Sequence, residues 1–272
     1  MTIDQNSTGT QFVTSADGTR IAYEKVGAGP ALVLVDGAMC RRSFGPARPL
    51  AKELADRFTV YLYDRRGRDE SGDTAPYAVG REVEDLAAII RATGETPFVS
   101  GSSSGAALAL EAAAAALPMR KLAVFEAPYM VAVEGHRAPV DSAAQARALI
   151  AQGKRGDAVK FFMSDMVGAP AIATVFMRLM PGVWKKATAA AHTIPYDAEV
   201  MGDFSVPVQR FAGIRVPTLV IVGGKSPDSM RVAEQAVTDA VPGAQLQTLP
   251  GQMHQVSAKA LAPMLAAYFT EN

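Results

Sequence analysis

The most informative part of the sequence is residues 97–110, which read PFVSGSSSGAALAL. Residues 97–100 predict a short buried strand, and the alanine-rich residues 106–116 predict a helix. Between them lies Gly101-Ser102-Ser103-Ser104-Gly105, a G-x-S-x-G motif at a strand–turn–helix junction. Small residues around Ser103 let strand and helix approach closely, so that its hydroxyl stands exposed above the sheet edge. Ser103 is therefore a candidate nucleophile; the alternative is a Gly/Ser turn that only caps the helix.

Short strands and helices alternate on both sides of this junction. Residues 11–14 and 19–26 predict a hairpin around Ala16-Asp17-Gly18. Further strands are predicted at 31–35, 58–63, 121–125, 218–222 and 245–249, and helices at 47–57, 81–92, 229–241 and 258–269. This alternation predicts an α/β fold: a mainly parallel, doubly wound sheet with helices on both faces. Ligands of such sheets bind beyond the carboxyl ends of the strands.

The alternation stops between residues 128 and 211. Short helices are predicted there at 142–152, 156–166, 171–179 and 184–192. We expect this block to be a helical lid (cap) inserted into a core domain of residues 1–127 and 212–272. The block is rich in Met and Phe, namely Phe161, Phe162, Met163, Met166, Phe176, Met177 and Met180. Such side chains fit an apolar substrate pocket, or simply the buried face of lid helices.

Composition narrows the classes of function. The 272 residues include 27 Lys+Arg, 27 Asp+Glu, 3 His and one cysteine, Cys40, with a formal net charge of +0. Balanced charge argues against nucleic acid or an anionic membrane as a partner. A single cysteine excludes an intrachain disulfide or a cysteine zinc site, and we expect no metal and no cofactor. No targeting or membrane-spanning segment is visible, so a cytoplasmic location is expected, and a homodimer is left open.

Three segments together resemble the α/β-hydrolase fold family. Besides the G-x-S-x-G turn, residues 33–38 (VLVDGA) look like its oxyanion loop, and residues 63–71 (YDRRGRDES) are similar to its D-x-R-G-x-G-x-S segment. Asp36 replaces the usual histidine, and Asp69 stands where the second glycine is usual, so a different loop backbone is expected there. The resemblance covers nearly the whole chain and implies a serine hydrolase.

His254 is the candidate general base. It follows the last predicted strand, where the resembled family carries its catalytic histidine. A neutral imidazole can take the serine proton and return it to the leaving group. The other two histidines, His136 and His192, fall in the predicted lid, where we expect surface or hydrogen-bonded side chains.

The acid that orients the histidine has two candidates. The family usually carries it after the next-to-last strand, in a pattern like G-x-x-D, but counting from Gly223 leads to Ser226, which is not anionic. Asp228 lies two positions later and is also a candidate helix N-cap. Glu126 follows the strand at 121–125, where some family branches carry the acid. A carboxylate at a buried strand end is costly unless paired, so we favour Glu126 over Asp228.

Backbone amides of the turn and the loop are expected to form the oxyanion hole. The candidates are Ser104 together with Ala38 or Gly37, while Asp36 is expected to bind nearby amides as a turn residue. The strand-end Glu, the Asp-Gly of the loop and the sequence Ser-Ser-Gly-Ala at the turn are similar to the zearalenone-hydrolysing lactonases of the family. That likeness makes Trp184 in the lid a candidate substrate contact, and Met39 beside the loop is another.

The predicted activity is hydrolysis of a small apolar ester or lactone through an acyl-enzyme. The lid has no Arg/Lys cluster that could hold an anionic substrate. The same three residues also suit carbon–carbon bond hydrolysis or perhydrolysis, which the sequence does not separate. A third hypothesis is a non-catalytic ligand-binding protein on this fold, motivated by the displaced acid and by Asp36.

Overall fold

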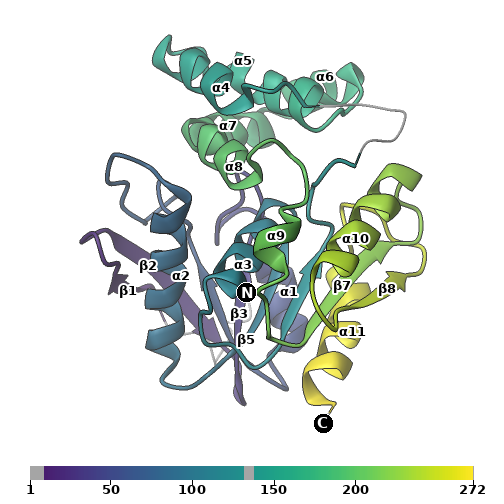
Figure 1. The fold of residues 1–272 in the computed structure, drawn as a ribbon. Coiled ribbons are helices and arrows are strands. Elements are labelled where there is room, and N and C mark those ends of the chain that lie inside the picture. Colours follow the sequence, from purple (N-terminus) through teal and green to yellow (C-terminus); the bar gives the residue numbers. More distant parts are fainter. Residues whose placement is uncertain (1–8, 132–137, 272) are drawn as a thin grey trace.

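The computed structural model describes residues 9–131 and 138–271, and its centre is an eight-stranded sheet (Figure 1). The strands are β1 (Gln11–Thr14), β2 (Arg20–Val26), β3 (Ala31–Val35), β4 (Thr59–Tyr63), β5 (Phe98–Ser102), β6 (Leu122–Phe125), β7 (Thr218–Gly223) and β8 (Gln245–Leu249). Their order is β1-β2-β4-β3-β5-β6-β7-β8. β2 is antiparallel to β1 and β4, and all other neighbours are parallel. The predicted hairpin and the mainly parallel sheet are confirmed.

Helices cover both faces of the sheet. They are α1 (Ala47–Leu54), α2 (Val79–Thr93), α3 (Ser104–Ala114), α9 (Val208–Phe211), α10 (Asp228–Ala240) and α11 (Ala258–Thr270). α1 packs against α11 on one face; α3 packs against α2 and α9 on the other, where α9 also meets α10. In Figure 1, α2, α3, α9 and α10 lie in front of the sheet.

The alternation of side chains along β3 shows why this run is apolar throughout. All of its residues are buried. Leu32 and Leu34 pack into the core beneath α1 and α11, whereas Val33 and Val35 pack into the core beneath α2 and α3. Successive side chains of a strand point to opposite faces, and both faces of this sheet are covered.

A helical insert, residues 142–201, lies between β6 and β7 and sits above the sheet in Figure 1. Its helices are α4 (Ser142–Ala151), α5 (Arg155–Phe161), α6 (Ala171–Arg178), α7 (Pro181–Ala190) and α8 (Ile194–Met201). A π-helical turn, Phe162–Met166, continues α5, and a 3₁₀ turn, Ala191–Thr193, precedes α8. α8 packs against α2 and α3, so it joins the insert to the helices that cover one face of the sheet. The domain limits at 128 and 211 stay a prediction.

The ends of several elements differ from the predicted ones by a few residues. β5 continues to Ser102, and α3 begins at Ser104 rather than at residue 106. α7 begins three residues before the predicted start, at Pro181, because proline is tolerated in the first turn of a helix.

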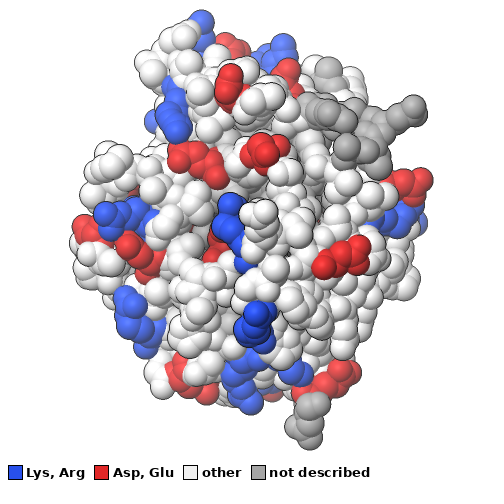
Figure 2. Space-filling model, in the orientation of Figure 1, with Lys and Arg blue, Asp and Glu red and all other residues white. Residues whose placement is uncertain are grey.

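Charge and apolar length complete the description. Figure 2 shows acidic and basic side chains interspersed over this face of the molecule, in keeping with the net charge of +0. None of the helices in the described ranges is both long enough and apolar enough to cross a membrane.

Candidate active site

Ser103 lies in a sharp turn between β5 and α3. Its φ is 56°, a left-handed conformation that residues other than glycine rarely adopt. Strand and helix nearly touch here: a β-carbon at Gly101 would lie 2.5 Å from the carbonyl oxygen of Gly105. A β-carbon at Gly105 would lie 2.2 Å from the carbonyl oxygen of Val35. Only glycine fits at positions 101 and 105. The turn between them presents Ser103 at the end of β5.

The loop after β8 brings His254 to Ser103. The imidazole Nε2 lies 3.2 Å from Ser103 Oγ, and Nδ1 lies 2.8 Å from Glu126 Oε2. The backbone N–H of Lys225 donates to the carbonyl oxygen of Gln252 at 2.8 Å, which ties this loop to the end of β7. The imidazole is half-exposed.

Glu126 is fully buried at the end of β6 and has a φ of 47°. Its Oε1 accepts hydrogen bonds from the Gly223 backbone N–H at 2.8 Å and from the Ser226 hydroxyl at 2.5 Å. Burial by itself raises the pKa of this carboxyl. The hydrogen bonds from His254, Ser226 and Gly223 outweigh burial and hold the pKa of Glu126 below its ordinary value. The side chain is therefore a carboxylate at neutral pH.

Of the two candidate acids, the structure brings Glu126 to the imidazole and leaves Asp228 at the surface. Asp228 is the first residue of α10, whose N-cap is Pro227. The Asp228 side chain is 91% exposed and forms an ion pair of 2.5 Å with Arg231.

Ser226 is a residue whose contact the sequence analysis missed. It occupies the position where the acid is usual, although it carries no charge. In the structure it is buried and donates its hydroxyl to Glu126. The signal for Ser226 is its position in the sequence. A polar residue at this position faces the loop that carries His254, as an acid there would.

The loop after β3 lies against the nucleophile turn. A β-carbon at Gly37 would lie 3.0 Å from Ser103 Cβ, so this residue is in direct contact with the serine. Ala38 follows, and Met39 is buried with a φ of 57°. Ser104 is the first residue of α3, and the first N–H groups of a helix have no partner within it. Backbone amides from both segments therefore lie beside Ser103.

Asp36 is buried, and its carboxylate lies beside Gly45 and Cys40. It accepts a hydrogen bond from the backbone of Ala47 at the start of α1, which is the kind of contact expected for a turn residue. Burial raises the pKa of Asp36 to about 7. Folding therefore keeps this group neutral in a pH range where an exposed aspartate is ionised.

We expect Asp36→Asn to gain stability relative to the wild type as pH rises from about 4 to about 7. The folded-state pKa of Asp36 is above the unfolded value, so the wild type loses stability across this window and the Asn variant does not. The gain should level off at on the order of 2–4 kcal/mol. Urea unfolding at about pH 4.5, 6 and 8 checks it. The exposed Asp228→Asn is the control, and a pH-independent difference at Asp36 would contradict the prediction.

The sequence model of a protein family described as the alpha/beta hydrolase family matches residues 28–265. The chain belongs to the α/β-hydrolase family. An alpha/beta hydrolase from Sphaerobacter thermophilus is 51% identical, with a TM-score of 0.90 over 96% of this chain and 100% of that one.

Two solved structures of lower identity share the fold of this hydrolase. A thermophilic esterase from Thermogutta terrifontis is 20% identical, with a TM-score of 0.73 over 96% of this chain and 98% of that one. An enol-lactonase from Burkholderia xenovorans is 21% identical, with a TM-score of 0.68 over 96% and 100%. At this identity the likeness establishes the α/β-hydrolase fold.

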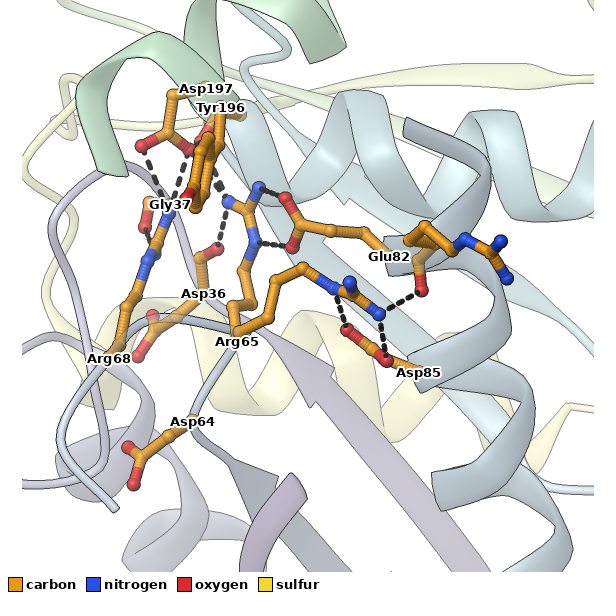
Figure 3. Close-up of polar contacts among 12 residues, drawn as sticks. Asp36, Gly37, Asp64, Arg65, Arg68, Glu82, Asp85, Tyr196 and Asp197 are labelled. Atoms are coloured by element: carbon orange, nitrogen blue, oxygen red, sulfur yellow. Dashed lines mark hydrogen bonds and ion pairs between the residues drawn. The ribbon is translucent and has the colours of Figure 1, made fainter. Parts of the chain in front are cut away.

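A cluster of buried charges in this hydrolase (Figure 3) is joined to the turn at Ser103 by a hydrogen bond from the Ser104 hydroxyl to Asp197. Arg65 binds both carboxylate oxygens of Glu82 at 2.7 Å and Asp197 Oδ1 at 2.8 Å. Arg68 binds both oxygens of Asp197 at 2.9 Å. All four side chains are at most 2% exposed. The arginine segment is visible in the sequence, but its partner in the insert is not.

Asp69, in the same segment of the hydrolase, stands in place of a usual glycine. It has a φ of 40°, so it keeps the left-handed conformation that glycine favours. Its carboxylate forms an ion pair of 2.8 Å with Arg41 and accepts a hydrogen bond from Ser43.

The structure places Trp184 within the insert of the hydrolase. The indole lies against Gly156, where a β-carbon would be 3.1 Å away, and the Arg178 guanidinium lies 4.9 Å from its ring centre. These contacts join α7 to α5 and α6. A contact of Trp184 with substrate stays a prediction, as does that of Met39.

The remaining histidines of the hydrolase lie away from Ser103 or outside the description. His192 Nε2 lies 2.7 Å from the carbonyl oxygen of Gly67, and Nδ1 lies 3.2 Å from that of Ala189. His136 lies outside the described residues. Within residues 9–131 and 138–271, no three His, Cys, Asp or Glu side chains are grouped as a metal ion would require.

Proposed function

We propose that this protein is a serine hydrolase that cleaves a small apolar ester or lactone through an acyl-enzyme. One observation carries the proposal: hydrogen bonds connect Ser103 Oγ to His254 Nε2 and His254 Nδ1 to Glu126. This order of hydroxyl, imidazole and carboxylate is that of a catalytic triad.

The proposed steps follow from this geometry. His254 takes the proton of Ser103 as the hydroxyl oxygen attacks the substrate carbonyl. The amides of Ser104 and of Ala38 (or Gly37) bind the oxyanion, and the imidazolium protonates the departing alcohol. A water molecule, deprotonated by His254, then attacks the acyl group; the bond to Ser103 Oγ breaks, the imidazolium returns the proton to that oxygen, and the acid is released. Glu126 stabilises the imidazolium and holds its tautomer.

The charges beside Ser103 favour a neutral substrate. The arginines that approach the oxyanion loop are each paired with a carboxylate: Arg41 with Asp69, Arg65 with Glu82 and Asp197, and Arg68 with Asp197. An anionic substrate needs a cation that is still free to bind it. Partly buried apolar side chains of the insert support an apolar substrate, although they also pack against the core: Phe161, Phe162, Met163 and Met177.

The test is a substrate panel of p-nitrophenyl esters of increasing chain length, simple and macrocyclic lactones, a β-diketone, and hydrogen peroxide with acetate. We expect the highest kcat/KM on a neutral ester or lactone. Rapid quenching should trap an acyl group on the peptide that contains Ser103. Faster cleavage of the β-diketone, or faster peracid formation, would replace ester hydrolysis by carbon–carbon hydrolysis or perhydrolysis. No turnover and no acyl adduct would favour a binding protein.

A further inference from the structure

Two arginines bind backbone carbonyl oxygens of the loop after β3 (Figure 3). Arg68 Nη1 donates to the carbonyl oxygen of Gly37 at 2.6 Å, and Arg65 Nη1 donates to that of Asp36 at 3.3 Å. In a trans peptide the C=O and N–H groups point in opposite directions. The bond to the Gly37 carbonyl therefore directs the N–H of Ala38 away from the arginines. The bond to the Asp36 carbonyl does the same for the N–H of Gly37.

Both arginines bind one carboxylate of the insert. Asp197, on α8, binds Arg65 at 2.8 Å and Arg68 at 2.9 Å, and it accepts the hydroxyl hydrogen bond of Ser104 at 2.8 Å. Although burial by itself raises the pKa of Asp197, the charges of Arg68 and Arg65 hold that pKa below its ordinary value. The carboxylate is thus ionised; it binds Ser104 directly and is linked to the loop after β3 through Arg65 and Arg68.

We propose that Asp197 is a positioning residue for the oxyanion hole, acting through Arg65, Arg68 and the side chain of Ser104. This inference rests on the proposed function, since it assigns a role within the same reaction. The insert then contributes to transition-state stabilisation and does more than cover the site. Cations behind the two carbonyls also polarise these peptides, which strengthens their N–H groups as donors.

A role in the oxyanion hole has a specific kinetic signature. Hydrogen bonds to the oxyanion form in the transition state, so misplacing their donors lowers kcat with little change in KM. A buried ion pair that only joins two elements affects stability instead. The pair of Arg66 and Asp85 is a matched control. Arg66 comes from the same arginine segment, and the pair is equally buried and bidentate at 2.7 Å. The other partners of Arg66 are Asp17 and the carbonyl oxygen of Arg81, which lie outside the loop and outside α3.

The experiment compares Asp197→Asn with Asp85→Asn on a p-nitrophenyl ester. We expect kcat to fall by about 10²-fold in Asp197→Asn with KM within about threefold, as for loss of one oxyanion donor. Affinity for a trifluoromethyl ketone, which forms a tetrahedral oxyanion on the serine, should fall in parallel. Asp85→Asn should keep its kcat within about threefold even where its Tm drops.

The outcomes separate this inference from the proposed function. Absence of Ser103-dependent turnover in the wild type would overturn both. Ser103-dependent turnover with wild-type kcat in Asp197→Asn, or equal losses of kcat in the two variants, would overturn the positioning role alone. If Asp197→Asn does not fold, Arg68→Lys against Arg66→Lys makes the same comparison, because lysine keeps the charge but does not span Asp197 and Gly37 together.

Discussion

Ser103→Ala is expected to lower kcat/KM for ester hydrolysis by about 10⁴- to 10⁶-fold. The substitution removes the oxygen that attacks the carbonyl, and the remaining oxyanion amides act only on direct attack by water. A fluorophosphonate probe followed by intact-mass measurement should add one label to the wild type and none to the variant.

Ser102→Ala is the matched control for this experiment. Ser102 is the last residue of β5, and its hydroxyl precedes the nucleophile by one position in the same turn. We expect its variant to be labelled and to keep its activity within about threefold, as for a substitution outside the reacting groups. Turnover or labelling that persists in Ser103→Ala would assign the nucleophile to another residue.

Glu126→Gln is expected to lower kcat by about 10³- to 10⁴-fold, with a smaller change in KM. The amide keeps the shape of the side chain but removes the charge that stabilises the imidazolium, and it permits the wrong tautomer of His254. Because the pKa of Glu126 lies below its ordinary value, the wild-type carboxylate is ionised throughout the neutral range. The loss should therefore already be present at neutral pH, where the wild-type carboxylate carries its charge.

The comparison with Asp228→Asn makes this prediction specific. Asp228 is exposed and paired with Arg231, so its variant should keep kcat within about twofold. Circular dichroism and thermal unfolding of Glu126→Gln would show whether the buried acceptor of Gly223 and Ser226 is needed for folding. A fully active Glu126→Gln, with activity lost in Asp228→Asn, would move the orienting role to Asp228.

The parts of the fold that could be predicted from the sequence, and the candidate site residues, depend on local patterns. The turn at Ser103 was recognisable because close approach of strand and helix demands small residues next to it in the sequence. Glu126 was favoured because an unpaired carboxylate at a buried strand end is costly, and the structure indeed surrounds it with donors. The hairpin and the apolar strands follow from the period of two and from turn residues, which are also local.

The charge cluster could not be predicted because its members are far apart in the chain. Arg65 and Arg68 meet Asp197 across 132 and 129 residues. A charged segment carries no signal for its distant partner, and most such segments lie in solvent. The position of Trp184 could not be predicted either, since it depends on how the helices of the insert pack together. Helix ends were missed by a few residues because caps and first turns tolerate many residue types.

The distance of His254 from Ser103 along the chain, 151 residues, also bears on when the site forms during synthesis. Protein domains fold as the chain leaves the ribosome, beginning from the N-terminus. The nucleophile turn needs β3, β5 and α3, which are made early, whereas the imidazole follows β8, the last strand. Under the proposed function, a nascent chain therefore carries its serine without a base until β8 and the loop after it have been made, and turnover cannot begin before then.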